Sequence, residues 1–227
     1  MSMPDKLLTE AAGTFVFLTV IALSGHAGAL APLAVGLGLA AMVYMGGHVS
    51  GAHYNPAVSF GLFLRGVINA TTLGAYAAVQ VAAGSLAFVV AFLISGQTPG
   101  IHPGQGVYWS SALAAEVVFT AALVLVVLNV AATKETAGNS YYGLAIGFTV
   151  AAGAFTVGPI SGAAFNPAVG LAATVGSAVF DHGSWSDLWL YVVGPLLGAP
   201  IAAGIHTIQT RRWPIPPEES ESNVPAA

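Results

Sequence analysis

The stretch that decides the fold is SGAHYNPAV, residues 50–58, because it recurs as SGAAFNPAV at residues 161–169. Seven of the nine positions are identical between the two copies. Asn55 and Asn166 are 111 residues apart in a chain of 227 residues, so each half of the chain carries one copy. The chain therefore contains an internal repeat with one matched segment in each half.

Each copy contains Asn-Pro-Ala, at Asn55-Pro56-Ala57 and at Asn166-Pro167-Ala168. Asn is a favoured N-cap, and Pro is favoured at the first helical position because its missing N–H would have no partner there. One such tripeptide indicates only a capped helix. Two copies in matched contexts predict two short helices that begin sharply at equivalent places in the two halves.

The composition is that of a membrane protein. The chain is 56% hydrophobic and only 6% charged, with a mean hydropathy of +0.80, whereas soluble domains have about a quarter of charged residues. It has no cysteine, which excludes disulfides and cysteine-based metal sites. The net charge of −4 offers no basic surface for nucleic acid. We expect the lipid bilayer as surroundings, and neither a cofactor nor a metal ion.

Six apolar runs are long enough to cross about 30 Å of hydrocarbon, which needs roughly 17–25 residues. They are residues 6–24, 31–47, 70–94, 107–131, 141–157 and 184–207. Two shorter apolar stretches, 56–64 and 167–179, each begin with the Asn-Pro pair. Interfacial helices are one interpretation of these stretches, and re-entrant half-helices are the other. The repeat favours the half-helices, at 55–65 and 166–179. The expected fold is an all-α membrane protein with six transmembrane helices and two re-entrant half-helices.

The basic residues predict the orientation. With the N-terminus inside, all five fall on the cytoplasmic side, as the positive-inside rule requires. An aromatic belt is expected near the outer ends of the fourth and sixth spans. The basic residues are Lys6, Arg65, Lys134, Arg211 and Arg212, and the aromatic ones are Tyr108, Trp109, Trp185, Trp189 and Tyr191.

The two halves are predicted to have opposite topology. Each has three spans, and three is odd, so the second half enters the membrane from the opposite side. The expected repeats are residues 1–96 and 97–209, followed by a disordered cytoplasmic tail at 210–227 that is rich in Pro and Glu. Inverted repeats place the functional site near the midplane, where they meet.

Glu10 and Glu116 are the carboxylates that lie well inside predicted spans, one in each half. A charge at this depth is costly unless it is paired. A proton relay is one interpretation. The symmetric placement instead favours a structural role, in which each glutamate accepts hydrogen bonds from a re-entrant backbone that lipid cannot satisfy.

The paired half-helices suggest a transport route. If both end at the midplane, each N-terminus presents about half a positive charge, and the amides of Asn55 and Asn166 project there. A water molecule could accept from both donors and would then be unable to accept a proton from its neighbour. The positive helix ends also oppose cations. This arrangement would conduct neutral molecules, exclude protons and require no enzyme chemistry.

Up to about residue 209, the chain resembles the aquaporins of the major intrinsic protein family. The residues that carry the resemblance are Glu10 with 13–15, the segment 47–58, Gln80 with Gly84, Glu116, the segment 161–168, and Gly194-Pro195. The resemblance implies a homotetramer with one pore per subunit. In this family, residues comparable to His48 and His53 mainly hold the first re-entrant loop, and we place Gln80 in the same supporting set.

The family's outer constriction corresponds here to Val35, Ala154, Ala163 and Val169. Water-selective members typically have an aromatic residue, His, a small residue and Arg at these places. The resemblance therefore implies a wide, apolar, Arg-less filter, similar to those of tonoplast intrinsic proteins and of bacterial relatives associated with metalloids. The expected permeants are water, urea, ammonia, glycerol, hydrogen peroxide and neutral metalloid hydroxides. The alternative is a water-selective channel whose constriction is refilled by Phe155, Phe165 or a loop residue.

Other function classes are less compatible with the sequence. An intramembrane serine protease needs glycine two residues before its serine, and His48 and Pro159 occupy those places before Ser50 and Ser161. A non-conducting structural membrane protein stays open as a possibility. A pH gate formed by His26, His102 and His182 at the pore mouth is a further hypothesis. His206 is expected either to line the inner vestibule or to face lipid headgroups. The absence of a targeting signal favours the inner (plasma) membrane with both termini cytoplasmic.

Overall fold

The computed structural model describes residues 1–97, 100–181 and 183–210. Within these residues, every element of regular secondary structure is a helix. His182 and residues 211–227 lie outside the described residues, so that Arg211, Arg212 and all but Thr210 of the predicted disordered tail at 210–227 are not described. Five apolar segments are long enough to cross a membrane, and the first of them, Met3–Ser50, contains two helices joined by a short 3₁₀ segment. The prediction of six spanning helices is therefore confirmed in the described part of the chain.

The spanning helices are α1 (Met3–Leu23), α2 (Ala31–Ser50), α4 (Ala70–Ser95), α5 (Trp109–Val127), α6 (Tyr142–Ser161) and α8 (Leu188–Gln209). The two half-helices are α3 (Pro56–Leu64) and α7 (Pro167–Phe180). Short helical turns η1 (Ser24–Leu30), η2 (Leu128–Ala132) and η3 (Lys134–Thr136) connect them, η2 being a π-helical turn that continues α5.

Local sequence signals set several helix ends. Ser2 and Asp5 form a capping box at the start of α1, with Ser2 N donating to Asp5 Oδ2 over 2.9 Å. Asn69 caps α4 by accepting from Thr72 N over 2.8 Å. Gly51 ends α2 in the left-handed region with φ of 90°, a conformation that glycine adopts without strain.

The structure differs from the expectations at several places. α8 begins at Leu188 rather than at 184, because residues 184–187, Ser-Trp-Ser-Asp, form a bend and turn before it. α6 continues past the expected end at 157 to Ser161 and accommodates Pro159 in its last turn. Tyr191 was expected in the aromatic belt, but its side chain is buried and donates to Ser161 O over 2.6 Å. The other expected belt residues, Tyr108, Trp109, Trp185 and Trp189, are exposed.

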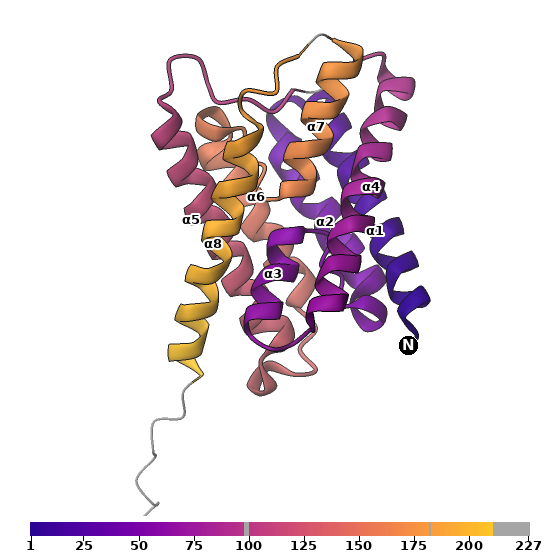
Figure 1. Ribbon diagram of the computed structural model, residues 1–227, viewed down its shortest axis with the longest axis vertical. Helices are drawn as coiled ribbons and strands as arrows, with labels where there is room; N and C mark the ends of the chain where they lie inside the picture. Colours follow the sequence, from indigo (N-terminus) through magenta and orange to yellow (C-terminus); the bar gives the residue numbers. More distant parts are fainter. Residues whose placement is uncertain (98–99, 182, 211–227) are drawn as a thin grey trace, which may run out of the picture.

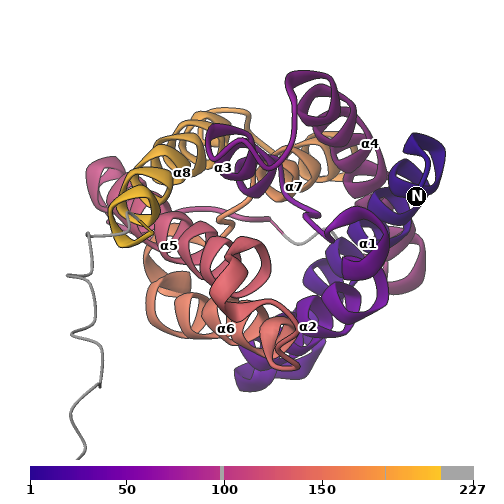
Figure 2. The same cartoon turned by 90° about the horizontal axis from the view of Figure 1, so that it is seen from below.

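The half-helices lie in opposite halves of the bundle, α3 in the lower half of Figure 1 and α7 in the upper half. Seen along the bundle, both lie between α4 and α8 (Figure 2). The long helices pack through small residues: a Cβ added at Gly36 of α2 would lie 2.6 Å from Gly147 O of α6. Such close backbone approach is typical of helix pairs in membranes.

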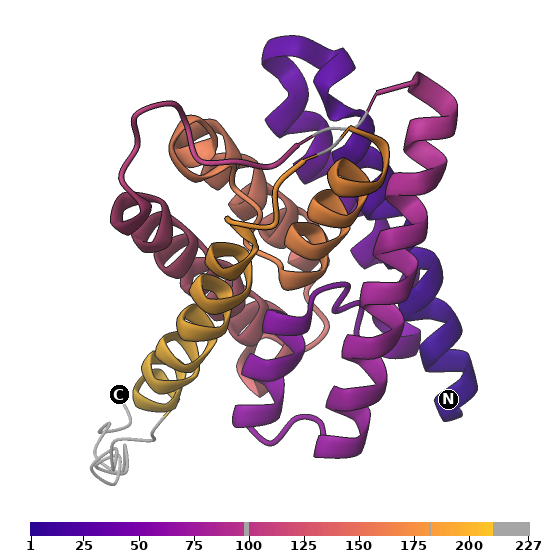
Figure 3. The ribbon, with the colours of Figure 1, turned by 45° about the horizontal axis from the view of Figure 1, so that its top comes forward.

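Both chain ends of the bundle lie on one side: α1 begins and α8 ends there, and we call this end the terminal face. The other end is called the opposite face (Figure 1). The end of α3 and the α5–α6 connection also lie at the terminal face, so Lys6, Arg65 and Lys134 are gathered there. On the opposite face, residues 100–108 run beside the α6–α7 segment (Figure 3), and Gly104 N donates to Ile160 O over 3.0 Å.

Candidate functional site

The two re-entrant segments, residues 51–64 and 162–180, meet tip to tip inside the bundle. Asn55 Nδ2 donates to Phe165 O over 2.9 Å, and Asn166 Nδ2 donates to Tyr54 O over 3.0 Å. Each segment therefore fixes the tip of the other by one reciprocal hydrogen bond.

Each asparagine also caps its own half-helix. Asn55 Oδ1 accepts from Ala57 N over 2.8 Å, and Asn166 Oδ1 accepts from Ala168 N over 2.9 Å. An asparagine amide carries two N–H donors, and the contact between the tips uses one of them. The geometry thus leaves one donor of each asparagine for a group that occupies the space beside the tips.

Glu10 lies at the base of the first re-entrant segment and accepts three hydrogen bonds from it. Its Oε1 accepts from Ser50 Oγ over 2.7 Å and from His53 N over 2.9 Å. Its Oε2 accepts from Tyr54 N over 2.8 Å. These bonds satisfy backbone N–H groups that no helix pairs.

Glu116 accepts the equivalent three bonds in the second half. Its Oε1 accepts from Ser161 Oγ over 2.7 Å and from Ala164 N over 3.1 Å, and its Oε2 accepts from Phe165 N over 2.7 Å. Both glutamates are fully buried. Each accepts from one loop and from the serine that precedes it, an arrangement suited to supporting that loop.

The loop backbone needs this support because it is strained at matching positions. Ala52 and Tyr54 have φ of 52° and 50°, and Ala163 and Phe165 have φ of 54° and 49°. The left-handed region costs a non-glycine residue roughly 1–2 kcal/mol. Such a conformation persists only where its surroundings determine it, and the glutamate contacts do so here.

The first segment has additional polar support. Gln80 Nε2 donates to Glu10 Oε2 over 2.9 Å and to Ser59 Oγ over 3.2 Å. His53 Nδ1 lies 2.9 Å from the same Ser59 hydroxyl. The prediction grouped His48 with these residues, and that is wrong: His48 is exposed at the end of α2, with no hydrogen bond to the loop among the described residues. Helical geometry turns its side chain away from the segment that follows it.

A cavity of about 290 Å³ runs beside the tips. Asn55 and Asn166 both line it, as do Val35 of α2, Ala154 of α6 and Ala163 of the second segment. Val169 does not belong to this lining in the part of the chain that is described; it is 1% exposed and packs in the core. The prediction for Val169 is therefore corrected: its short side chain, in the first turn of α7, faces packed neighbours.

The lining is almost entirely apolar. Among the described lining residues, polar side chains come from Ser24, His53, Asn55 and Asn166, and none is a carboxylate, Lys or Arg. A molecule in this cavity meets hydrogen-bonding side chains mainly near the tips.

Several lining residues were missed from the sequence, and three of them are instructive. Phe17 and Ile21 come from α1, and Ile101 comes from the loop on the opposite face. Phe17 lies two helical turns after Glu10, so helical spacing from Glu10 offered a signal for it. Ile101 belongs to no motif, and nothing in the sequence pattern marks it.

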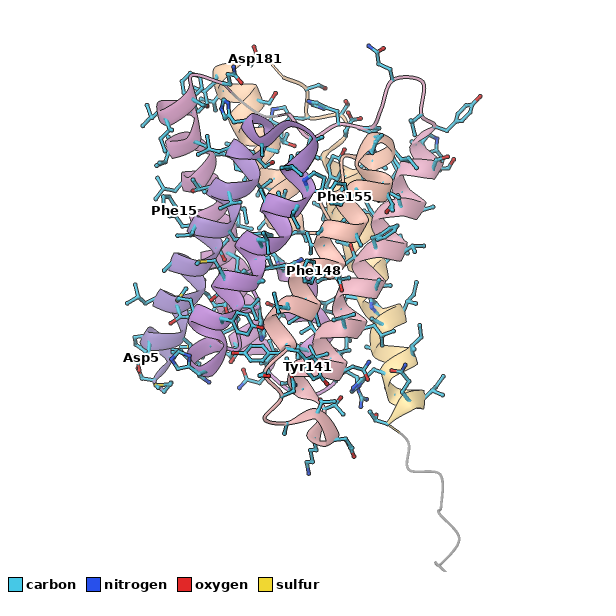
Figure 4. All side chains as sticks on the ribbon, turned by 180° about the vertical axis from the view of Figure 1, so that it is seen from behind. Asp5, Phe15, Tyr141, Phe148, Phe155 and Asp181 are labelled. Atoms are coloured by element: carbon cyan, nitrogen blue, oxygen red, sulfur yellow. The ribbon has the colours of Figure 1, made fainter. Side chains whose placement is uncertain are left out.

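The side chains proposed to refill the constriction lie in different places. Phe155 is 51% exposed on the outward side of α6 (Figure 4). The Phe165 ring stacks on Phe119, with 5.6 Å between ring centroids, and Phe165 also belongs to the cavity lining. Ile101, from the loop on the opposite face, lines the cavity as well.

Two of the three histidines of the predicted pH gate, His26 and His102, lie within the described residues. His102 Nδ1 lies 3.7 Å from Asp187 Oδ2, and His26 is exposed elsewhere on the same face. No group of three or more His, Asp or Glu side chains suited to a metal ion occurs among the residues searched, which are those described.

Comparison with known proteins agrees with this geometry. The family model described as "Major intrinsic protein" matches residues 3–206. The rice protein "Probable aquaporin TIP3-2" is 34% identical over 208 residues, which cover 90% of this chain and 77% of the relative. Rice "Aquaporin NIP1-4" is 36% identical over 180 residues, covering 78% of this chain and 63% of the relative.

A solved structure shares the fold. The aquaglyceroporin from Plasmodium falciparum superposes with a TM-score of 0.78, covering 90% of this chain and 96% of that chain. Its sequence identity is 20%, so the likeness concerns the arrangement of helices and not the choice of solute.

Proposed function

Because the chain belongs to the major intrinsic protein family, we propose that its conducting route is the cavity between the two re-entrant segments, and that this route passes water together with small uncharged solutes. The protein is a multi-pass membrane channel and not an enzyme. The observation that carries the proposal is a cavity lined by both asparagines at the meeting point of two half-helices.

The midplane of this route is formed by Asn55-Pro56-Ala57 and Asn166-Pro167-Ala168. The N-termini of α3 and α7 both point at it, and each carries about half a positive charge. The remaining amide donors of Asn55 and Asn166 give a passing water two hydrogen bonds to its oxygen. Such a water has no lone pair left for a proton from its neighbour, so proton transfer along the file is interrupted, and the helix ends oppose cations.

The selectivity of the route is set by Val35, Ala154 and Ala163, together with the absence of an arginine. These three side chains are small and apolar, and Val169 is too short to reach the cavity from its buried position. A constriction of this kind imposes little size restriction and offers no fixed cation. The candidate solutes are urea, ammonia, glycerol, hydrogen peroxide and neutral metalloid hydroxides.

A water-selective channel is the second candidate, and one observation favours it. Ile101 lines the cavity from the loop, and a Cβ added at Gly162, next to Ala163, would lie 2.7 Å from Ile101 Cγ2. A branched side chain at this level narrows the route that the small helix residues leave wide.

The assembly and location form part of the proposal. The protein is a homotetramer in the inner (plasma) membrane, with the terminal face in the cytoplasm and the halves divided at 1–96 and 97–209. Lys6, Arg65 and Lys134 support this orientation because all three lie at the terminal face, and cytoplasmic ends are enriched in Lys and Arg.

Stopped-flow light scattering on proteoliposomes tests the proposal. We expect fast shrinkage in an osmotic gradient, followed by fast reswelling when urea is the osmolyte. Shrinkage without reswelling would select the water-selective candidate, and the absence of both would reject a conducting route.

Two phenylalanine variants locate the constriction. Val35→Phe adds a ring to the cavity wall and is expected to abolish urea reswelling while water still passes. Leu37→Phe is the matched control, because Leu37 is exposed on the same helix and does not line the cavity. Equal urea flux in both variants would contradict the assignment of the constriction to Val35.

A further inference from the structure

Arg65 makes three hydrogen bonds to the last turns of α8 at the terminal face. Its Nε donates to His206 Nδ1 over 2.9 Å, and its two terminal nitrogens donate to Thr207 Oγ1 over 2.7 Å and Thr210 Oγ1 over 3.3 Å. All three acceptors are uncharged. His206 is 5% exposed, so the contact lies in a protected place.

These contacts fix the protonation state of His206. An arginine is a donor only and keeps its charge in proteins, so Nδ1 must be the acceptor and cannot carry a proton. The ring proton of the neutral imidazole then lies on Nε2, which is 2.8 Å from Thr133 Oγ1. Thr133 Oγ1 in turn donates to Leu128 O over 2.9 Å. One chain of hydrogen bonds thus runs from Arg65 through His206 to the end of α5.

This chain joins the terminal ends of three helices. Arg65 is the C-cap of α3, Thr133 follows the π-helical turn that ends α5, and His206 lies in the last turn of α8. Two of these helices also line the cavity, α3 through Val58 and α5 through Leu123 and Val127. The cluster of Arg65, His206 and Thr133, which we call the latch, therefore anchors the ends of elements that form the cavity wall.

Helices α3 and α5 are in close contact in this wall. A Cβ added at Gly61 of α3 would overlap with Val124 Cγ1 of α5. Interiors packed at this density transmit displacement to their neighbours instead of absorbing it.

A second proton on His206 is incompatible with the latch. It would have to bind Nδ1, where it would face the N–H of Arg65 and bring two positive charges into contact. The end of α8 favours a cation, but Arg65 already supplies it. Among the described residues, Arg65 is the charged group that faces the imidazole; Thr133 and Thr207 are neutral, and Lys134 and Glu135 are exposed on η3. Protonation must therefore break the contact between Arg65 and His206.

We propose that protonation of His206 opens the latch on the terminal side of the channel. The contact between Arg65 and His206 is intact when His206 is neutral and is broken in acid. Release frees the ends of α3 and α5, and the wall formed by Val58, Leu123 and Val127 loses its fixed position. Apolar constrictions gate by dewetting, so the water permeability falls on acidification. The inference rests on the proposed channel function.

The test compares the water permeability of proteoliposomes as the pH is lowered from about 8 to about 5, the range in which histidine titrates. The wild-type protein is expected to lose permeability by at least about threefold, as the wetted passage dries. His206→Asn keeps an acceptor for Arg65 and has no titratable ring, so its permeability is expected to stay constant. A pH response that persists in His206→Asn, or a wild-type protein without any response, would overturn the latch.

The controls separate the latch from other histidines and from the channel function. His48→Asn removes an exposed histidine of the same face and should keep the wild-type response. A response that vanishes in His48→Asn would assign the effect to that residue and reject the latch. If no water passes at any pH, the proposed function itself fails, which is a different outcome from flux without pH dependence.

A spectroscopic measurement stands independently of any variant. In protein labelled with ¹⁵N in histidine and arginine, the His206 ring is identified by its coupling across the hydrogen bond to Arg65 Nε. We expect a neutral ring protonated on Nε2 at neutral pH, and loss of the coupling on acidification. A ring protonated on Nδ1, or a coupling that survives acidification, would contradict the latch.

Discussion

The two re-entrant segments are nearly identical in their contacts, although their side chains differ. Each places two non-glycine residues in the left-handed region, each gives three hydrogen bonds to one buried glutamate, and each sends one asparagine to the tip of the other. A tyrosine hydroxyl also donates to the serine carbonyl before each re-entrant segment. Tyr76 donates to Ser50 O over 2.8 Å, and Tyr191 donates to Ser161 O over 2.6 Å.

The difference lies in a set of polar side chains that the first segment alone possesses. His53, Ser59 and Gln80 are joined by hydrogen bonds in the first half. Counted from the repeat and from the two tyrosines, the equivalent positions in the second half are Ala164, Gly170 and Pro195. None of these three can form a side-chain hydrogen bond.

The comparison separates what the loop conformation needs from what it tolerates. Since the second segment keeps the same backbone without the polar set, the glutamate, the serine and the asparagine are sufficient for that conformation. His53 also lines the cavity. We therefore interpret His53, alone in this polar set, as serving the cavity wall in addition to the loop.

The largest effect is expected from removing a glutamate. Glu116→Ala leaves three buried donors without an acceptor, each at a cost of about 1–3 kcal/mol, so the protein should lose at least about 3 kcal/mol of stability. Glu10→Ala should lose as much or more, because Gln80 loses its acceptor too. Thermal unfolding in detergent measures both variants. Glu135→Ala, an exposed acidic residue, is the control and should unfold like the wild type.

Removing an asparagine from a tip should have the next largest effect, and the same one in both halves. Asn55→Ala and Asn166→Ala each lose a helix cap worth about 1 kcal/mol and a hydrogen bond between the tips worth about as much. Water permeability should fall in both variants. Asn69→Ala is the matched control, because Asn69 caps α4 but makes no contact between the halves. A loss in Asn69→Ala equal to that in the tip variants would mean that the contact between the tips contributes nothing.

A smaller effect is expected from giving the first segment the side chains of the second. His53→Ala should change stability by no more than about 1 kcal/mol, because the loop keeps its glutamate contacts. The solute preference of the channel should change, since the cavity loses a polar lining residue. Unfolding midpoints and the ratio of urea to water flux measure the two effects. A loss of stability in His53→Ala as large as that in Glu10→Ala would contradict the conclusion that the loop needs only its glutamate contacts. His102→Ala, at an exposed histidine, is the control.

The smallest effect concerns the strained backbone. Ala52→Gly and Ala163→Gly relieve a left-handed residue but add flexibility to the unfolded chain, so each should stabilise the protein by less than about 1 kcal/mol. Ala112→Gly, at a buried helical position, should instead destabilise it by about 1 kcal/mol. Thermal unfolding distinguishes the signs. Destabilisation of all three variants alike would show that the left-handed conformation carries no strain.

Much of the fold followed from patterns that are local in the chain. Each feature that predicted it can be recognised within a short stretch of sequence. These features are the apolar runs of membrane length, the duplicated Asn-Pro-Ala and the single glutamates inside apolar runs. For this reason the predicted half-helix at 55–65 differs from α3, Pro56–Leu64, by only one residue at each end. His48 and Tyr191 were misplaced because the side of the helix that each occupies depends on the packing of the whole bundle.

The six spans, the two half-helices and the residues at their tips were predictable from the sequence, since periodicity, capping chemistry and the internal repeat are local properties of the chain. Which side chains reach the cavity depends on the tertiary structure. In the structure Ile101 lines the cavity from a loop, Val169 is buried in the core, and Arg65 contacts His206, which lies 141 residues later in the sequence. These contacts depend on how closely helices that are distant in sequence approach one another. No local sequence pattern specifies that approach.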